Sequence, residues 1–276
     1  MPMSTETQSE KSASIRAISR SVAVLQAINR SSSLTLTHIS EAVGLPYPTT
    51  TRIVRTLVEV GLIEQEPSRK RYRPTALVQT LSCGFQNHDR LVSTARAHIV
   101  ELTRLIDWPV SVVTRVGKHM MVRDSTSTIT SLTFNNYYPG WQVPLLSSAS
   151  GRVYFAHASA QERAELLKQY ATDSQGLDSL IIKEFRDGDA VAKIVEAGYA
   201  AVARTAYSAN PGRTSSIAVP LFENGVLLGS LALVFFAQAA SMSKAIERLL
   251  EPLRRTALAI QADLERNLPQ PEPQDE

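Results

Sequence analysis

Two arginines and several hydroxyl side chains recur at helical spacing after residue 50. If residues 48–60 form a helix, a rotation of about 100° per residue separates two sides. One side carries Thr51, Arg52, Arg55, Thr56 and Glu59. The opposite side, expected to be buried, carries Thr50, Ile53, Val54, Leu57 and Val58. Guanidinium and hydroxyl groups suit phosphate oxygens and base edges, since arginine can donate two parallel hydrogen bonds to guanine. The alternative is an ordinary solvated helix face.

The flanking sequence predicts the elements that would present this face. A first helix is indicated by apolar residues at helical spacing, Val22, Leu25 and Ile28. A second short helix over residues 37–43 should end at Gly44, and a third should begin at Pro48 and end at Gly61. Two β segments, residues 62–64 and 72–74, follow. This order is typical of a winged helix-turn-helix, whose second motif helix enters the DNA major groove.

The predicted hairpin has a basic tip. Within five residues it carries Arg69, Lys70, Arg71 and Arg73. Such a wing could follow the DNA backbone or enter the minor groove, and Tyr47 could donate to a phosphate. A basic hairpin tip on its own is commonplace, so the interpretation rests on motif order, burial register and wing charge together. The predicted DNA-contacting residues are Arg20, Tyr47, Thr49, Thr51, Arg52, Arg55, Arg69, Lys70 and Arg71.

Several segments resemble the IclR family of bacterial transcription regulators. In the N-terminal part they are ISRSVAVL at residues 18–25, LTHISEAVGLP at 36–46, TTTRIVRTL at 49–57, GLI at 61–63 and RYRP at 71–74. Pro48 stands where the family often has serine, and Tyr47 where it often has a small or basic residue. These departures concern which bases are read. The resemblance covers nearly the whole chain and implies a winged helix-turn-helix joined to a GAF-like α/β effector-binding domain.

The C-terminal part continues the resemblance. Its matching segments are GWQVPLLSSASGR at residues 140–152, GYAAVART at 198–205, SSIAVP at 215–220 and GSLALVFF at 229–236. The first leads into a helix start with exposed backbone N–H groups, which favours an anion, although most such helix starts bind no ligand. Arg204 could bind a carboxylate, or it could be a surface residue. The predicted effector-binding residues are Leu146, Ser148, Ala149, Gly151, Arg204, Ser216, Ala232 and Val234.

An apolar floor with one or two donors favours an aromatic or other bulky acid over a small hydroxy or keto acid. The chain looks similar to the branch of the family that activates catabolism of aromatic acids such as hydroxyphenylpropionates. This similarity implies an activator, with a repressor as the alternative. The expected partners are double-stranded operator DNA, an acid effector, RNA polymerase if the protein activates, and a second copy of the chain in a homodimer, with a tetramer as the alternative.

The expected organisation is α+β, with two domains and a linker. Residues 15–76 form the winged helix-turn-helix, 77–90 a linker helix and 91–266 the effector-binding domain. The polar segments 1–14 and 267–276 are expected to be disordered. The final helix, marked by Ile246, Leu249 and Leu253, is expected to bend at Pro252.

Composition and motifs argue against other classes of protein. There is one cysteine, Cys83, and five scattered histidines, so neither an internal disulfide nor a metal site is indicated. The N-terminal residues lack the apolar core of a signal peptide, and we expect a cytoplasmic protein without a membrane span or a cofactor. Nucleophile elbows, dinucleotide fingerprints and phosphate loops are absent, which argues against an enzyme. An RNA-binding or structural winged-helix module would leave the large C-terminal domain without a role.

Overall fold

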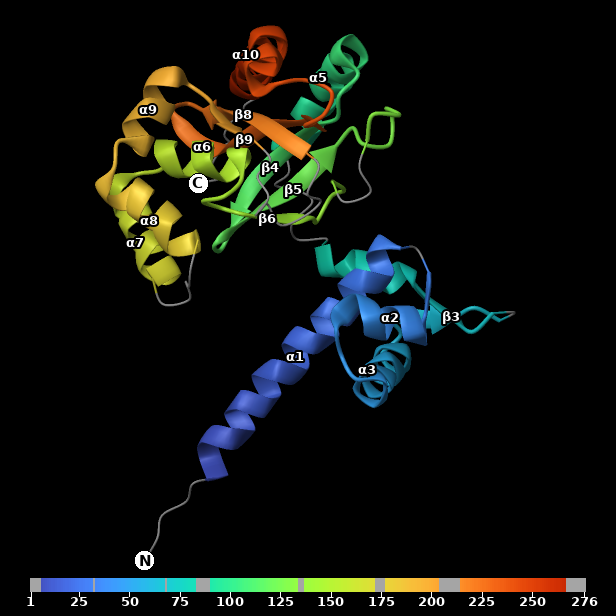
Figure 1. The fold of residues 1–276 in the computed structure, drawn as a ribbon. Helices are drawn as coiled ribbons and strands as arrows, with labels where there is room; N and C mark the ends of the chain where they lie inside the picture. The colour runs from blue at the N-terminus through green and yellow to red at the C-terminus, as the bar shows by residue number, and fades with distance from the viewer. Residues whose placement is uncertain are drawn as a thin grey trace, which may run out of the picture. The chain divides into compact units, whose positions relative to one another are not determined.

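The structure is a computed structural model that describes residues 6–31, 33–67, 69–82, 90–133, 137–171, 177–203 and 214–266 (Figure 1). The chain divides into two compact units, Met1–His88 and Asp89–Glu276. We call them the N-terminal unit and the C-terminal unit, and each is described by itself.

The N-terminal unit combines helices with a small sheet. Its elements in chain order are α1 (Glu6–Arg30), β1 (Leu34–Thr35), α2 (Leu36–Val43), α3 (Tyr47–Glu59), β2 (Ile63–Gln65), β3 (Arg71–Pro74) and the 3-10 helix η1 (Ala76–Ser82). The three strands form an antiparallel sheet in the order β1-β3-β2. Helices α2 and α3 with the β2–β3 hairpin therefore make a winged helix-turn-helix.

Local sequence signals set the turn between α2 and α3. The side chain of Thr35 caps α2 by accepting a hydrogen bond from the N–H of His38. Gly44 ends the same helix in the left-handed region, with φ of 62°, where a residue without Cβ is favoured. The helices then pack around a small apolar core made of Val24, Ile28, Ile39, Val54, Leu57 and Ile63.

The C-terminal unit is built on one six-stranded sheet. Its helices are α5 (Arg90–Ile106), α6 (Ala149–His157), α7 (Ala160–Ala171), α8 (Leu177–Asp187), α9 (Ala190–Ala197) and α10 (Met242–Arg266). Its strands are β4 (Val110–Val116), β5 (His119–Ser125), β6 (Gln142–Pro144), β7 (Ala200–Val202), β8 (Thr214–Glu223) and β9 (Val226–Phe236). The strand order is β6-β5-β4-β9-β8-β7, and all neighbours are antiparallel.

Helices cover both faces of this sheet. Helices α5 and α10 lie side by side on one face, and α6 lies on the other (Figure 1). Side chains alternate along β9 between the two layers, so that Leu231 and Leu233 pack with α5 and α10, whereas Ala232 packs with α6. The smaller residues on the α6 side are the ones that border the cavity described below.

A β-bulge changes this alternation on β5. Val113 on β4 pairs with Val122, but the preceding Val112 pairs with Asp124, so Arg123 is an extra residue in β5. Residues directly opposite each other share a face of the sheet. The bulge therefore turns Asp124 toward α5 and places Ser125 on the α6 side.

Several elements differ from the sequence expectations. Helix α1 begins at Glu6, inside the segment 1–14 that was expected to be disordered. The linker is a 3-10 helix over Ala76–Ser82, and the rest of the expected linker helix, with Cys83, lies outside the described residues. The short strands β1 and β6 were not predicted.

Candidate nucleic-acid interface and ligand cavity

The two sides of α3 differ in burial as the sequence predicts. Thr50 is fully buried and Val54 and Leu57 are buried, whereas Arg52 and Arg55 are exposed. The hydroxyl of Thr50 donates to the carbonyl of Pro46, which satisfies this buried polar group. Val58 is the exception, because its side chain is 38% exposed and it does not belong to the core. The guanidinium-bearing side of α3 therefore faces solvent.

The start of α3 is also accessible. Tyr47 is the first helical residue and is 52% exposed, and Pro48 sits in the first turn, where a missing N–H costs no helical hydrogen bond. Thr49 and Thr51 are half-buried. The hydroxyl of Thr51 donates to the carbonyl of Tyr47 over 2.8 Å. Because this bond uses the hydroxyl proton, Thr51 can contact a base only as a hydrogen-bond acceptor or through its methyl group.

Some basic side chains of the hairpin are exposed to solvent, and others are hydrogen-bonded or ion-paired within the unit. Arg69 and Lys70 are exposed at the tip. Arg71, which the sequence predicts to contact DNA, donates from Nε to the hydroxyl of Ser33 over 2.9 Å and from Nη2 to its carbonyl over 2.7 Å. Arg73 forms an ion pair of 2.7 Å with Glu64, the residue opposite it on β2. Arg71 thus fastens β3 to the β1 turn, and the wing offers chiefly Arg69 and Lys70.

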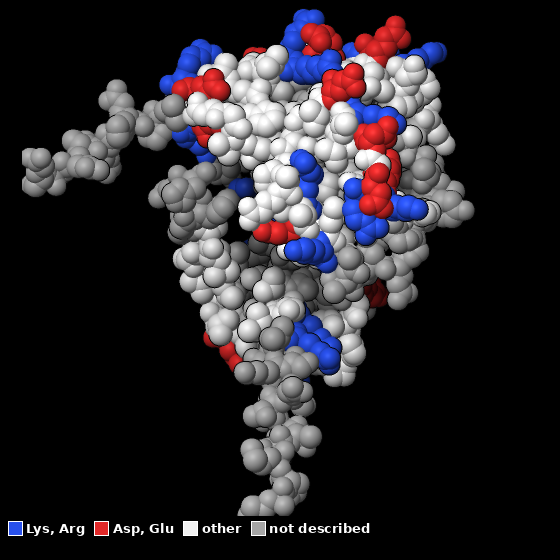
Figure 2. All heavy atoms as spheres, turned by 90° about the vertical axis from the view of Figure 1, so that its left-hand side faces the viewer, with Lys and Arg blue, Asp and Glu red and all other residues white. Residues whose placement is uncertain are grey.

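Positive charge is concentrated in the N-terminal unit. This unit, residues 1–88, contains ten Lys and Arg and six Asp and Glu, a surplus of four positive charges, whereas the whole chain carries +3. One of these cations, Arg20, is exposed on α1. On the face of the C-terminal unit seen in Figure 2, basic and acidic side chains are interspersed. Charge therefore favours the N-terminal unit as the part that meets a polyanion.

The C-terminal unit contains a cavity of about 40 Å³ between the sheet and the start of α6. Five predicted effector-binding residues line it: Ser148, Ala149, Ser216, Ala232 and Val234. Sequence reasoning missed its other lining residues, Ser111, Val113, Val122, Tyr137, Val143 and Ser150. The structure thus brings most of the predicted residues to one place.

Two of the predicted residues lie away from this cavity, and a third falls outside the described residues. Leu146 is 4% exposed and packs in the core on the α6 side. Gly151 lies inside α6, where a Cβ would be 1.9 Å from the carbonyl oxygen of Leu145, so its role is close packing. Arg204 lies outside the described residues.

Helix α6 begins at the cavity with a defined cap. The Ser148 hydroxyl accepts from the N–H of Gly151 over 3.1 Å and donates to the carbonyl of Pro144 over 2.7 Å. The N–H groups of Ala149 and Ser150 have no acceptor within the helix, because the first turn of any helix lacks such partners. Together with the helix dipole they make this end of the cavity suitable for a carboxylate.

Tyr137 closes another side of the cavity. Burial raises the pKa of its phenol, while a hydrogen bond with Thr214 opposes that effect. Tyr137 is therefore neutral at ordinary pH and can act as donor or acceptor. No signal in the local sequence marks this tyrosine, since it reaches the cavity through tertiary structure. Ser111, in contrast, is a polar residue within an apolar strand, and that irregularity could have singled it out.

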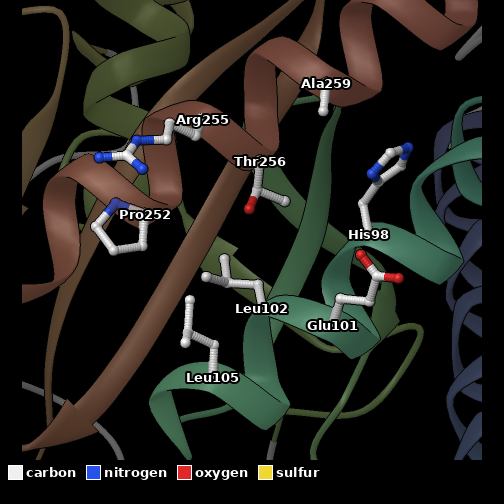
Figure 3. Close-up of a pocket in the computed structure, with 8 residues that line it drawn as sticks. All are labelled: His98, Glu101, Leu102, Leu105, Pro252, Arg255, Thr256 and Ala259. Carbon is white, nitrogen blue, oxygen red and sulfur yellow. The ribbon is translucent and has the colours of Figure 1, made fainter.

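A second hollow lies elsewhere on the C-terminal unit, between α5 and α10 (Figure 3). It is larger, about 310 Å³, and is lined by His98, Glu101, Leu102, Leu105, Pro252, Arg255, Thr256 and Ala259. None of the predicted effector-binding residues that the structure describes borders it. It lies on the outer surface of the two helices, away from the small polar groups that gather at α6.

None of the helices in the described ranges is long and apolar enough to span a membrane. Within the same ranges, no group of three or more His, Cys, Asp or Glu side chains is arranged to hold a metal ion.

Comparison with known proteins agrees with this division of the chain. Residues 17–67 match the IclR helix-turn-helix domain, and residues 85–262 match the domain described as bacterial transcriptional regulator IclR C-terminal. YiaJ, a DNA-binding transcriptional repressor of Escherichia coli (strain K12), is 24% identical over 259 residues, which are 93% of this chain and 90% of that protein.

Solved structures share the fold. An IclR homolog complexed with 4-hydroxybenzoate, from Microbacterium hydrocarbonoxydans, has a TM-score of 0.64 at 24% identity and covers 91% of this chain and 100% of its own. The IclR of Thermotoga maritima has a TM-score of 0.60 at 18% identity and covers 92% and 99%, respectively. The predicted fold class, a helix-turn-helix unit followed by an α/β domain, is confirmed.

Proposed function

The chain belongs to the IclR family of bacterial transcriptional regulators. We propose that it binds operator DNA with the outward side of α3, and that an organic acid bound near α6 controls the affinity for DNA. A DNA-binding regulator of this family is not an enzyme.

One observation carries the DNA interface: α3 buries Val54 and Leu57 while Arg52 and Arg55 are exposed. A recognition helix needs this arrangement, since its aliphatic side must pack on the domain while its polar side enters the major groove. Tyr47, Thr49 and Thr51 at the helix start contribute further contacts. Arg69 and Lys70 in the wing, with Arg20 on α1, supply contacts to phosphates.

The effector is an organic acid held in the cavity at α6. Its carboxylate is bound by the N–H groups at the start of α6, and the rest lies against Val113, Val122 and Ala232. We place the effector among aromatic acids such as hydroxyphenylpropionates, because the wall is largely apolar and the fold neighbour from Microbacterium binds 4-hydroxybenzoate. Arg204, if it reaches this site, would add a second carboxylate contact.

An aromatic effector would have to widen the cavity. Its volume of about 40 Å³ holds only a few water-sized groups, whereas pockets for larger ligands span about 300–1,000 Å³. Binding would therefore move cavity side chains, and this movement is a source of differential affinity between two conformations. Through that difference the effector would shift the relative placement of two DNA-binding units in a homodimer or a tetramer.

We favour activation, working with RNA polymerase in the cytoplasm, because the sequence resembles an activating branch of the family. Repression is the second candidate, because the similar protein YiaJ is a repressor. A promoter–reporter fusion in strains with and without the gene distinguishes them. If the protein activates, reporter expression should be lost in the deletion strain. If it represses, reporter expression in the absence of effector should be higher in the deletion strain than in the wild type.

Fluorescence anisotropy with DNA from upstream of the gene and its neighbours tests the proposal. At near-physiological salt, the full chain should bind DNA with inverted half-sites more tightly than scrambled DNA of the same length. Addition of 3-(4-hydroxyphenyl)propionate should change that affinity. Equal binding to all DNA would overturn the operator interface, and an unchanged affinity with the acid would overturn the aromatic effector.

A further inference from the structure

A serine on β4 occupies an unusual place in the effector cavity. Ser111 lines the cavity and is only 2% exposed, within a strand whose neighbours Val110, Val112 and Val113 are all buried. It pairs across the sheet with Ala232, which also lines the cavity. A hydroxyl on this apolar wall costs stability unless its hydrogen-bonding capacity is used.

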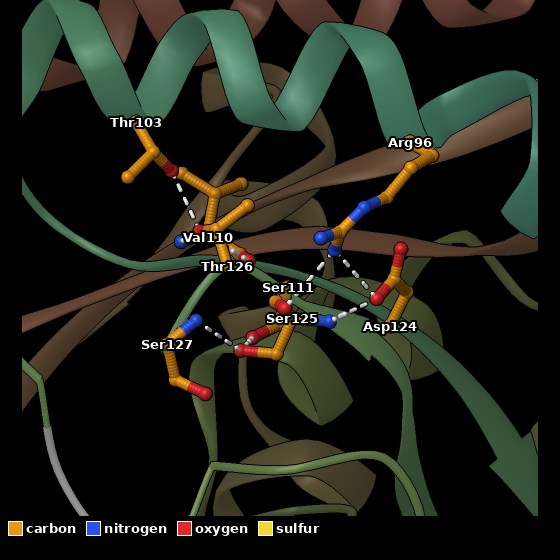
Figure 4. Close-up of polar contacts among 8 residues, drawn as sticks. All are labelled: Arg96, Thr103, Val110, Ser111, Asp124, Ser125, Thr126 and Ser127. Carbon is orange, nitrogen blue, oxygen red and sulfur yellow. Dashed lines mark hydrogen bonds and ion pairs between the residues drawn. The ribbon is translucent and has the colours of Figure 1, made fainter. Parts of the chain in front are cut away.

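The β-bulge at Arg123 supplies one partner for this hydroxyl. Because the bulge moves Ser125 to the α6 side, the side chains of Ser111 and Ser125 meet, and the Ser111 hydroxyl donates to that of Ser125 over 3.1 Å (Figure 4). The Ser125 hydroxyl also accepts from the N–H of Ser127 over 3.2 Å. Ser125 is thereby held in place as an acceptor.

This bonding decides what Ser111 can offer to a ligand. A serine hydroxyl has one proton and two lone pairs, and the proton of Ser111 is used by Ser125. Its lone pairs remain for a group in the cavity. Ser111 is therefore an acceptor on the sheet side of the cavity, whereas the N–H groups that begin α6 are donors on its helix side.

We infer that Ser111 selects effectors that carry a hydroxyl donor in addition to the carboxylate. The inference rests on the proposed function, since it assumes that the acid binds in this cavity. The chemical class is a hydroxy acid, in which the ligand hydroxyl donates to Ser111. The same acid without the hydroxyl would remove water from the Ser111 oxygen without replacing the lost hydrogen bond, and it would bind more weakly.

Isothermal titration of the full chain with two matched pairs of acids tests this selection. The pairs are 3-(4-hydroxyphenyl)propionate with 3-phenylpropionate, and lactate with propionate, so that both a large and a small effector are covered. For the pair that binds, we expect the hydroxylated acid to bind about tenfold more tightly, the effect of one neutral hydrogen bond. In Ser111→Ala this ratio should fall to near one.

Two variants separate this role from a general effect on folding. Ser111→Cys keeps a side chain of similar size but replaces oxygen with a weakly accepting sulfur, and it should also lose the preference. Ser93→Ala removes an exposed serine hydroxyl on α5, outside the cavity, and should keep the preference. Thermal unfolding of each variant shows whether the C-terminal unit remains folded.

The outcomes discriminate between the two proposals. Equal affinity of the wild-type chain for both members of a binding pair would overturn the role of Ser111 and leave the acid effector intact. A tenfold preference that persists in both Ser111→Ala and Ser111→Cys would do the same. Failure of all four acids to bind would overturn the effector cavity itself, and the inference about Ser111 with it.

Discussion

Arg96 on α5 and Asp124 on β5 form an ion pair, with Nη1 of the arginine 2.9 Å from Oδ1 of the carboxylate. The same Nη1 donates to the carbonyl of Ser125 over 3.2 Å, and Ser125 contacts Ser111 at the cavity (Figure 4). Helix α5 is the first described element after the linker. The bulge at Arg123 is what permits both contacts, because without it Asp124 would share the α6 side with Val122, and Ser125 would face α5.

Breaking this pair should weaken the C-terminal unit and its response to the effector. A double-mutant cycle with Arg96→Ala and Asp124→Asn should give a coupling energy of about 1 kcal/mol in chemical unfolding, since Arg96 is partly exposed and solvent screens the pair. The effector-induced change in DNA affinity should also decrease in each single variant, if α5 transmits the change.

The matched control for that cycle is an ion pair on the surface of α10. Arg255 and Glu251 lie 3.0 Å apart with side chains 75% and 58% exposed, so their coupling should be within about 0.5 kcal/mol of zero. A coupling for Arg96 and Asp124 as small as this one would show that the pair does not hold α5 to the sheet. An unaltered effector response would remove α5 from the route of transmission.

Alanine substitution of the α3 arginines should weaken DNA binding. If Arg52 or Arg55 contacts a base, its loss should cost about 1–3 kcal/mol, measured by anisotropy with operator DNA. If the residue contacts a phosphate, the affinity for all DNA should fall and the slope of log affinity against log salt should decrease by about one. The two readouts therefore separate base reading from phosphate contact.

Arg186→Ala is a suitable control for these variants. Arg186 is an exposed arginine on α8, in the C-terminal unit, where it forms an ion pair with Asp187. It should leave DNA affinity unchanged. If Arg52→Ala and Arg55→Ala behave like this control in both affinity and salt slope, the outward side of α3 is only a solvated face.

The sequence allowed the N-terminal unit to be predicted well because its signals are local. The spacing of Val54 and Leu57 sets the register of α3, and Gly44 marks the turn before it. One expectation was wrong, because Val58 lies at the edge of the apolar side and remains exposed. The tertiary contact of Arg71 could not be predicted either, because Ser33 is 38 residues away and cannot be identified by periodicity.

The cavity could be predicted only in part, because distant strands form it. Ser148 and Ala232 could be predicted because they lie in segments, residues 140–152 and 229–236, that resemble the IclR family. Ser111 was missed because its place depends on the pairing of β4 with β5 and β9. Tyr137 was missed because it lies outside the strands and borders the cavity through tertiary contacts, such as its hydrogen bond with Thr214. An alternating pattern gives the face of each residue only while the strand is regular, and the bulge at Arg123 breaks that rule.

Gly151→Ala should destabilise the C-terminal unit without altering the N-terminal unit. The added Cβ would lie 1.9 Å from the carbonyl oxygen of Leu145, so the turn before α6 must move. Overpacking of this kind costs about 1–3 kcal/mol or more, and the melting temperature of the unit should fall by several degrees. Binding of the hydroxylated acid should fall as well, because Ser148 and Ala149 belong to the same turn.

Gly117→Ala separates crowding from the loss of a glycine. Gly117 has φ of 59°, but a Cβ there would meet nothing within 4 Å, so only backbone strain of about 1 kcal/mol is expected. Effector binding should survive in this variant. If Gly151→Ala unfolds at the same temperature as the wild-type chain, α6 does not pack so closely on the carbonyl of Leu145 that a glycine is required.

His157 should make the C-terminal unit less stable as pH falls. It ends α6, where its ring lies edge-on to Phe222 with centroids 5.5 Å apart, and its buried Nε2 has no hydrogen-bond partner in the described residues. Burial lowers the pKa of His157 below its ordinary value of 6.5. Below pH of about 6.5 the unfolded chain therefore binds a proton that the folded chain does not, which favours unfolding. The free energy of unfolding should decrease from pH 7 toward the folded pKa and then level off.

Urea unfolding of the full chain at pH 7, 6 and 5 measures this effect. In His157→Gln the decrease between pH 7 and 5 should be smaller than in the wild-type chain, by on the order of 1 kcal/mol or less, because the half-exposed ring is screened by solvent. His38→Gln, at an exposed position on α2, should retain the wild-type dependence of the C-terminal transition. Identical pH dependence in the wild-type chain and in His157→Gln would mean that the ring takes up a proton as readily in the folded state as in the unfolded one.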